Sequence, residues 1–377
     1  MLSKRVIASN VVRLRNDRDW SQAELAKRAD LSRVAIGKIE RAETQPRERS
    51  LSKLARALDV PLRELLSEVR RLHTVRFRAA KRVNTREQIL SEVSRWLDDY
   101  NDLEEILQAK GGFAFRELVG DSAPPDKLAK KARRQIELGP HEPIRDICGL
   151  LEDHGVKVLL LEKKSDSFFG LSVAAAEGGP AVVVNTWDRI SVERWIFTAA
   201  HELGHLLLHP AAYDLSKTDE SELEERQADQ FASHLLMPKE AFDKEWDEGR
   251  GLDFISRVFK IKRIFRVSYK TVLYRLVEST RADKTIWRKW NSQYKATFKT
   301  SLKYKDEPKG LSHSEFRLKW NRAGEPEALS HSDFEQDRLL RLIRLGLEAG
   351  DISRGRAGEV LGKTRTEMRE LTASWVN

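Results

Sequence analysis

The sequence predicts a mainly helical α+β protein, with a bundle of five short helices near the N-terminus and a larger domain that combines helices with a small antiparallel β-sheet. Helical spacing of apolar residues recurs along most of the 377 residues. Three short apolar runs, 155–161, 168–173 and 181–184, are typical of strands. Turn residues separate the runs, so antiparallel pairing fits them better than parallel pairing.

The basic charge of the chain is concentrated at one end. The formal net charge is +9, but residues 1–82 hold 21 Lys and Arg against 10 Asp and Glu, and the remainder is slightly acidic. This distribution indicates a partner with negative charge at the N-terminal domain. The single cysteine, Cys148, excludes an internal disulfide framework. No apolar run is long enough to span a membrane and no signal peptide is visible, so we expect a cytoplasmic protein without a membrane partner.

Composition shifts and turn signals divide the chain into four parts. We expect a five-helix bundle over 1–68, a helical linker over 69–122, an α+β domain over 123–280 and a C-terminal helical region over 281–377. The linker contains a helical pattern, and a helix there could pair with the same helix of a second subunit. A homodimer is therefore one alternative for the oligomeric state. Near the C-terminus, 352–371 predicts two short helices around a turn, either a second helix-turn-helix or a docking tail.

Two helix starts define the centre of the N-terminal bundle. Ser21-Gln-Ala-Glu24 forms a capping-box pattern, and Ser32 is a second N-cap residue ahead of a helix over 33–40. Two short helices joined by a tight turn form a helix-turn-helix, in which the second helix can enter the major groove of DNA.

The segments Trp20-Ser-Gln-Ala-Glu-Leu-Ala and Ala35-Ile-Gly-Lys-Ile-Glu resemble the Cro/phage-repressor (XRE) type of helix-turn-helix. The resemblance implies double-stranded DNA as a partner, with Gln22 at a phosphate. It also places Arg33, Val34 and Lys38 at base-reading positions. The alternatives are a helical bundle with a solvated basic face and a protein-interaction module.

The chemistry of the larger domain centres on the stretch from Phe197 to His209. His201 and His205 are four residues apart, so both rings lie on one helix face, and Glu202 completes the His-Glu-x-x-His pattern of zinc hydrolases. Leucines surround the motif, as expected for an interior helix. Gly204, beside the histidines, would let another backbone come close.

A second helical pattern about twenty residues later offers a third ligand. Glu225 would complete a two-histidine, one-glutamate site with one position open to water. Asp229, one turn further on, could accept the ring N–H of a ligand histidine. Glu224 points about 100° away from that stripe. Without the third ligand, the two histidines could equally be core residues bonded to backbone carbonyls.

The order of motifs in this domain resembles the ImmA/IrrE metallopeptidases over roughly 126–276. It runs through Leu-Glu-Asp-His-Gly-Val-Lys-Val, Phe-Gly-Leu-Ser, Pro-Ala-Val-Val-Val-Asn, His-Glu-Leu-Gly-His, Glu-Arg-Gln-Ala-Asp-Gln-Phe-Ala and Leu-Leu-Met-Pro. Many members of the family carry the same kind of N-terminal helix-turn-helix. The resemblance implies Zn2+ at His201, His205 and Glu225, and Glu202 as general base. It also implies cleavage of a transcriptional repressor in response to a stress or mobile-element signal.

The sequence thus predicts a zinc-dependent regulatory endopeptidase with a DNA-binding domain. The rival interpretation is a DNA-binding regulator whose zinc site is a sensor or a structural brace. We expect an extended substrate to add to an exposed sheet edge at Val182–Val184. For the group that stabilises the oxyanion, Tyr213 is one candidate, and His234 fits poorly because it lies about 180° round the helix from Glu225.

Overall fold

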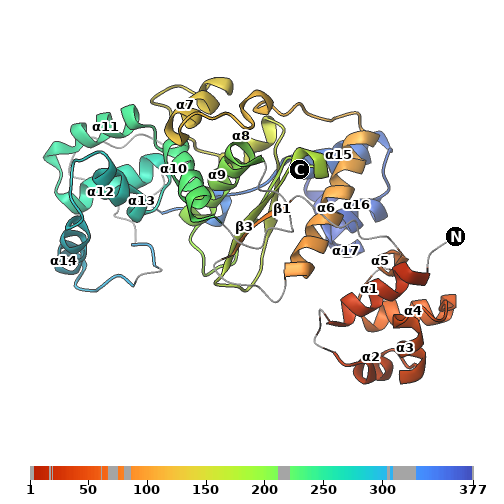
Figure 1. The fold of residues 1–377 in the computed structure, drawn as a ribbon. Coiled ribbons are helices and arrows are strands. Elements are labelled where there is room, and N and C mark those ends of the chain that lie inside the picture. Colours follow the sequence, from red (N-terminus) through yellow and green to blue (C-terminus); the bar gives the residue numbers. More distant parts are fainter. Residues whose placement is uncertain are drawn as a thin grey trace. The chain divides into compact units, whose positions relative to one another are not determined.

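The computed structural model describes residues 4–16, 18, 20–60, 62–66, 75–79, 86–210, 221–303, 306–308 and 328–375 (Figure 1). The chain forms two compact units. One consists of Met1–Leu72 with Arg82–Asp98, and the other of His73–Lys81 with Asp99–Asn377. Within the described residues, no helix combines the length and apolar character needed to cross a membrane.

The first unit contains the five short helices that the sequence predicts: α1 (Lys4–Asn16), α2 (Gln22–Arg28), α3 (Arg33–Glu40), α4 (Glu48–Ala57) and α5 (Leu62–Leu66). Ser21 and Ser32 cap α2 and α3, because each hydroxyl oxygen accepts a hydrogen bond from the backbone N–H three residues on. One apolar core joins the helices, and its members include Ile7, Val11, Leu14, Leu25, Ile36, Leu54 and Leu58.

The segment expected as a helical linker contains one long helix and also a strand. Helix α6 (Arg86–Ile106) contributes its first part, to Asp98, to the first unit, where Arg95 forms an ion pair with Glu64. Strand β1 (Val75–Ala79) belongs to the second unit. The prediction of a wholly helical linker was therefore wrong at β1, where the alternation of apolar and basic residues in Val75-Arg-Phe-Arg-Ala79 was a usable signal of a strand.

The second unit is built on a four-stranded sheet with the strand order β1-β3-β4-β2. Strands β2 (Lys157–Leu161), β3 (Phe168–Val173) and β4 (Ala181–Asn185) coincide with the three predicted apolar runs. Strand β3 is antiparallel to both β1 and β4, whereas β2 is parallel to β4. The α+β class is confirmed, but the sheet is mixed and not purely antiparallel. Strands β2, β3 and β4 do alternate in direction along the chain, and the parallel pair arises because β3 lies beyond β4 instead of between β4 and β2.

The expected docking edge at Val182–Val184 is not an edge. These residues lie in β4, which is hydrogen-bonded to β3 on one side and to β2 on the other. All five residues of β4 are buried. The outer strands of the sheet are β1 and β2.

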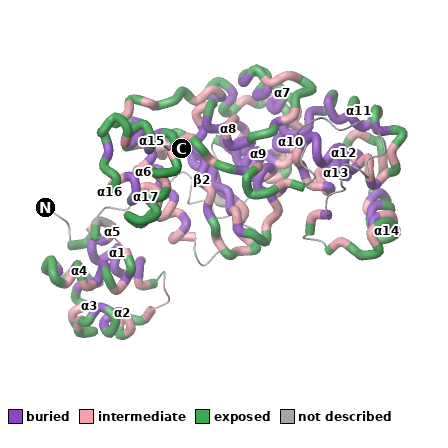
Figure 2. The backbone as a smooth tube through the Cα atoms, turned by 180° about the vertical axis from the view of Figure 1, so that it is seen from behind, coloured by how far each residue is buried: buried purple, intermediate pink, exposed green. Residues whose placement is uncertain are grey.

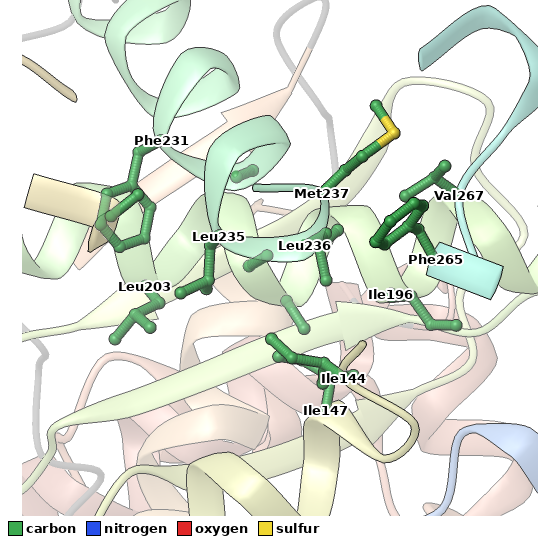
Figure 3. Packing of buried hydrophobic residues seen from close by; sticks show 14 of the residues in the cluster. Ile144, Ile147, Ile196, Leu203, Phe231, Leu235, Leu236, Met237, Phe265 and Val267 are labelled. Atoms are coloured by element: carbon green, nitrogen blue, oxygen red, sulfur yellow. The ribbon is translucent and has the colours of Figure 1, made fainter. Parts of the chain in front are cut away.

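Helices cover the sheet and enclose the main core. Helix α9 (Val192–Leu208) packs on β3 and β4, and α10 (Glu222–Leu236) packs between α9 and α7 (Pro125–Gln135). Helix α8 (Ile147–Asp153) lies against β2 and α9. Figure 3 shows this core, in which side chains from α8, α9, α10 and the end of α12 meet, among them Ile147, Ile196, Leu203, Phe231, Leu235 and Phe265.

The remaining helices extend the same unit. They are α11 (Lys239–Glu248), α12 (Phe254–Phe265), α13 (Tyr269–Glu278), α14 (Ile286–Phe298), α15 (Arg338–Ala349), α16 (Arg354–Leu361) and α17 (Arg365–Ser374), with short 3-10 turns at Arg116–Leu118, Ala175–Glu177, Gly249–Gly251 and His331–Asp333. Ile286, Trp290 and Phe334 belong to the main core, so residues beyond 280 share the packing of the α+β domain. Arg338 of α15 donates a hydrogen bond to Glu104 of α6 at 2.5 Å.

Two glycines allow the close approach of neighbouring elements to α9. A Cβ at Gly204 would lie 3.3 Å from Ala228 Cα on α10, so the expected role of Gly204 is confirmed. A Cβ at Gly170 on β3 would lie 2.6 Å from Thr198 Cγ2 on α9 and 2.8 Å from Val183 O. Distances this short require one of these elements to move.

We expect Gly170→Ala to lower the free energy of unfolding by about 1–3 kcal/mol, the usual cost of overpacking a filled core. Urea denaturation of the metal-free protein measures this difference. Gly112→Ala is the matched control, because a Cβ there meets nothing within 4 Å. Equal stability of the two variants would contradict the close packing of β3 on α9.

Candidate metal centre

Helix α9 holds the His-Glu-x-x-His motif in the interior of the second unit. Ser191 caps the helix by accepting a hydrogen bond from Arg194 N. Apolar side chains on nearly every side let the helix pack against the sheet on one face and α10 on another, as its almost continuous burial shows (Figure 2). His201, Glu202 and His205 all have 0% exposure.

Three side chains from α9 and α10 converge on one point. His201 Nε2 lies 3.3 Å from Glu225 Oε2, and His205 Nε2 lies 3.0 Å from Glu225 Oε1. The two Nε2 atoms are 2.9 Å apart. All three potential ligand atoms lie within 4.8 Å of one another. Two imidazole nitrogens and a carboxylate form the donor set of a zinc-type site, so the residues present fit a divalent metal ion.

The position of Glu225 on α10 favours a charged carboxylate. Burial raises the pKa of Glu225, but hydrogen bonds from His201 and His205 outweigh it and bring the pKa well below its usual value. Glu225 also lies in the first turn of α10, where the helix dipole favours negative charge. The neighbouring Glu224 is not part of the three-residue cluster found among the described residues.

Further polar groups hold the rings of the two histidines. His201 Nδ1 lies 2.8 Å from Asp229 Oδ1, which is the contact that helical spacing predicts for Asp229. His205 Nδ1 lies 3.0 Å from His209 Nδ1. His209 Nε2 in turn lies 2.9 Å from Gln227 Oε1. Neither His209 nor Gln227 was predicted as a site residue, although the i, i+4 spacing of His205 and His209 was a usable signal.

The sheet also contributes to the site, through a residue that the sequence analysis missed. Ser172 of β3 has 0% exposure, and its hydroxyl donates a 2.8 Å hydrogen bond to Glu202 Oε2. This bond fixes one carboxylate oxygen of Glu202. No pattern in the sequence indicates it, because it depends on the register of β3 against α9.

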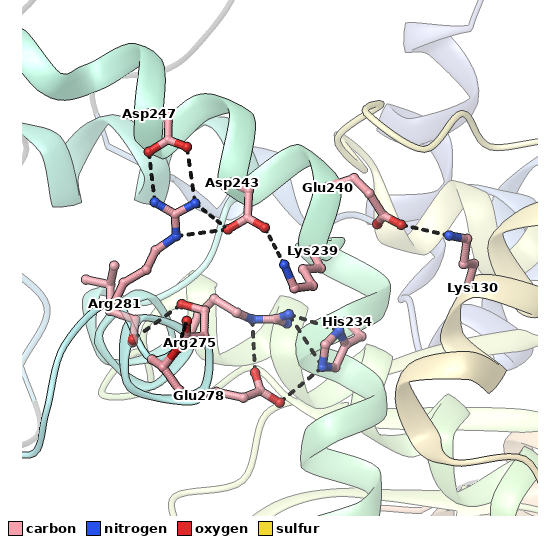
Figure 4. A network of polar contacts seen from close by, with 12 residues as sticks. Lys130, His234, Lys239, Glu240, Asp243, Asp247, Arg275, Glu278 and Arg281 are labelled. Atoms are coloured by element: carbon pink, nitrogen blue, oxygen red, sulfur yellow. Dashed lines mark hydrogen bonds and ion pairs between the residues drawn. The ribbon is translucent and has the colours of Figure 1, made fainter.

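The structure describes only one of the two residues considered for stabilising the oxyanion. Tyr213 lies outside the described residues. His234 is held in a separate polar network, with Nε2 3.2 Å from Glu278 Oε1 and Nδ1 2.9 Å from Arg275 Nη1 (Figure 4). The hydrogen bond from His234 is the main reason that the pKa of Glu278 lies below its usual value. His234 therefore contacts Glu278 and Arg275 at the far end of α10 and is not part of the cluster of His201, His205 and Glu225.

The helix-turn-helix unit presents three of the four predicted DNA-contacting residues to solvent. Arg33, Val34 and Lys38 are exposed on α3, and Val34 has 67% exposure despite its apolar side chain. Gln22 is partly buried, and its Nε2 donates a 2.7 Å hydrogen bond to Glu40 Oε2. Because an amide nitrogen has two N–H donors, this bond leaves a second donor for another acceptor.

Comparison with known protein families matches both units, in the order that the sequence predicts. Residues 12–65 match the family model described as "Helix-turn-helix", and residues 151–277 match a peptidase family model described as "IrrE N-terminal-like domain". No curated protein matches the chain. The chain therefore combines a DNA-binding type of helix-turn-helix with an IrrE-like peptidase domain, and the predicted resemblance is confirmed over these segments. The proposed metal ligands and Glu202 all lie within the peptidase match.

We expect Ser172→Ala to lower the free energy of unfolding of the metal-free protein by about 1–3 kcal/mol, because a buried carboxylate loses a hydrogen-bond donor. A double-mutant cycle with Glu202→Gln isolates the Ser172–Glu202 pair, and a coupling energy above about 0.5 kcal/mol is expected. Ser332→Ala, at an exposed serine, is the control. Strictly additive effects would mean that the contact contributes no stability.

Proposed function

We propose that this protein is a zinc-dependent regulatory endopeptidase that binds DNA and cleaves a transcriptional repressor or an antitoxin-like partner. The observation that carries the proposal is the convergence of His201, His205 and Glu225 beside a glutamate, Glu202, that a sheet residue holds in place. The matches to a peptidase domain and a helix-turn-helix support the two halves of the proposal. A duplex-DNA partner implies action in the cytoplasm.

The roles of the side chains follow from their geometry. When bound, zinc would polarise the scissile carbonyl and make a water molecule more acidic. Glu202 would accept a proton from that water and pass it to the leaving amine. Ser172 would keep Glu202 in the orientation of a base, and Asp229 would orient His201.

The substrate class is proposed on the combination of the two units. A peptidase that carries a DNA-reading domain is held near other proteins bound to DNA, which raises their local concentration around the peptidase. Repressors are such proteins, and the predicted family resemblance also implies one. A stress or mobile-element signal is the corresponding proposal for regulation.

The rival function is that of a DNA-binding regulator with a structural or sensory metal. A structural zinc site usually has four protein ligands, whereas three converge here among the residues that the structure describes. A structural site also has no need of a carboxylate that lies next to the metal and is positioned by its own hydrogen bond. These two features favour the peptidase.

We expect the purified protein to bind about one zinc per chain, and His201→Ala or His205→Ala to abolish tight binding, because each removes one of three ligands. Glu225→Gln should weaken zinc binding, whereas the matched variant Glu224→Gln should leave it nearly unchanged. Elemental analysis and competition with a chelator measure both effects. Full zinc occupancy in the His205 variant would contradict the assignment.

The experiment that tests the peptidase function compares the wild type with Glu202→Gln. Loss of a general base lowers the rate by about 10²–10⁴ while zinc, fold and DNA binding are kept. Candidate repressors encoded near this protein are incubated with each zinc-loaded form, and cleavage is followed by mass spectrometry. Normal regulation of the target in cells that carry Glu202→Gln would favour the rival function.

We expect two DNA contacts to behave differently in the full chain. Arg33→Ala removes a proposed base contact and should cost about 1–3 kcal/mol on the preferred site, with relaxed sequence choice. Gln22→Ala should weaken binding to all sequences alike, since phosphate contacts do not specify sequence.

Titration of specific and scrambled duplexes at two salt concentrations measures this difference. Higher salt should weaken binding by both variants, because counterions are released when the basic unit binds. An equal loss on both duplexes for Arg33→Ala would show that α3 does not read the sequence.

A further inference from the structure

A third histidine, the C-cap residue of α9, has no part in the catalytic roles described above. His209 ends the helix, four residues after His205, and has only 8% exposure. Its Nδ1 faces His205 Nδ1 at 3.0 Å, and its Nε2 faces Gln227 Oε1 at 2.9 Å. The three side chains form a continuous chain from a proposed metal ligand to α10.

We propose that His209 and Gln227 are positioning residues for the metal centre, which hold His205 in the tautomer and ring orientation that present Nε2 to the ion. The inference rests on the proposed metal site. Under this proposal an imidazole and an amide support His205, whereas the carboxylate of Asp229 supports His201.

The donors and acceptors along the contacts from His205 through His209 to Gln227 can all be matched when each imidazole is neutral. A neutral imidazole carries one proton, so a His205 that binds metal through Nε2 must carry its proton on Nδ1. The partner atom, His209 Nδ1, must then accept with its lone pair, which leaves the proton of His209 on Nε2. That proton needs an acceptor, and the atom found there is the carbonyl oxygen of Gln227.

The two ligand histidines are therefore held by unlike acceptors, one on α10 and one at the end of α9. His201 faces the carboxylate of Asp229, whose side chain has 49% exposure, whereas His205 faces the ring of His209, which is buried. Glu225, Gln227 and Asp229 alternate along the first turns of α10. This helix thus supplies the third ligand and the end groups of both supports.

A purely structural role for His209 makes a different prediction. A buried ring that only fills space at the end of α9 would affect the stability of the metal-free protein and leave the metal affinity of the folded protein unchanged. A positioning role affects the zinc affinity itself, typically by 10–100-fold for loss of such a partner.

The test compares zinc dissociation constants, measured by chelator competition, in the full chain and its variants. His209→Leu keeps an apolar volume and removes the acceptor, so we expect zinc to bind about 10–100-fold more weakly. His209→Asn places an amide oxygen near the position of Nδ1 and should restore most of the affinity. Gln227→Leu should weaken zinc binding, and Gln227→Glu, which keeps an acceptor oxygen, should not.

Further measurements distinguish an effect on the positioning of His205 from an effect on the stability of the fold. Thermal unfolding of each metal-free variant reports stability, and the visible spectrum of the cobalt-substituted protein reports the ligand geometry. His154→Leu is the matched control, since the ring of His154 contacts Leu150 O in the same unit. It should leave zinc affinity unchanged.

Three results would overturn the inference. Equal zinc affinities in the wild type, His209→Leu and Gln227→Leu would overturn it alone and leave the metal centre standing. His209→Leu could also lose zinc affinity in parallel with a loss of stability of the metal-free protein. If His209→Asn then failed to restore the affinity, His209 would have only a structural role. A wild type that binds no zinc would overturn the metal centre and this inference together.

Discussion

The close packing of α9 against both the sheet and α10 is the constraint on which the site depends. Gly170 brings β3 close to α9, and Gly204 brings α10 close on another side. Without the first approach Ser172 could not reach Glu202, and without the second Glu225 could not reach the histidines. Two positions that lack a side chain thus determine where the functional side chains meet.

Both ends of α9 are held by buried polar contacts. At its start, Glu193 forms an ion pair with Lys262 of α12, and Lys262 also contacts Glu307 at 3.3 Å. Burial is the main reason that the pKa of Glu307 is raised to about 7. At its end, His209 contacts Gln227 of α10. A helix held at both ends keeps its ligands in place with little reorganisation, which is what precise metal binding requires.

Local periodicity was sufficient to predict which residues of the site share a face within α9 and which share a face within α10. The i, i+4 pair His201 and His205, and the spacing of Glu225 and Asp229, follow from the helical repeat, and the structure brings these four side chains together. The helix-turn-helix was predictable for the same reason, since its caps and apolar positions are local.

Apart from His209, which has a local spacing signal, the features of the site and the sheet that the sequence did not reveal depend on contacts between distant segments. Ser172 acts through the register of β3 against α9, and the parallel pairing of β2 with β4 depends on which side of β4 the third strand takes. Strand β1 obtains its partner from a segment almost a hundred residues away, from Arg76 to Ser172 for example. Residue spacing within one element contains no information on such choices.

The two units are interleaved along the chain. The backbone passes from one unit to the other after residues 72, 81 and 98, since β1 belongs to the peptidase sheet while the first part of α6 belongs with the helix-turn-helix. A recombination event with a single junction in this region would therefore separate either β1 from its sheet or α6 from its bundle. Replacement of the helix-turn-helix unit during evolution would require a break on each side of β1 and another within α6, so the two units are expected to be inherited together.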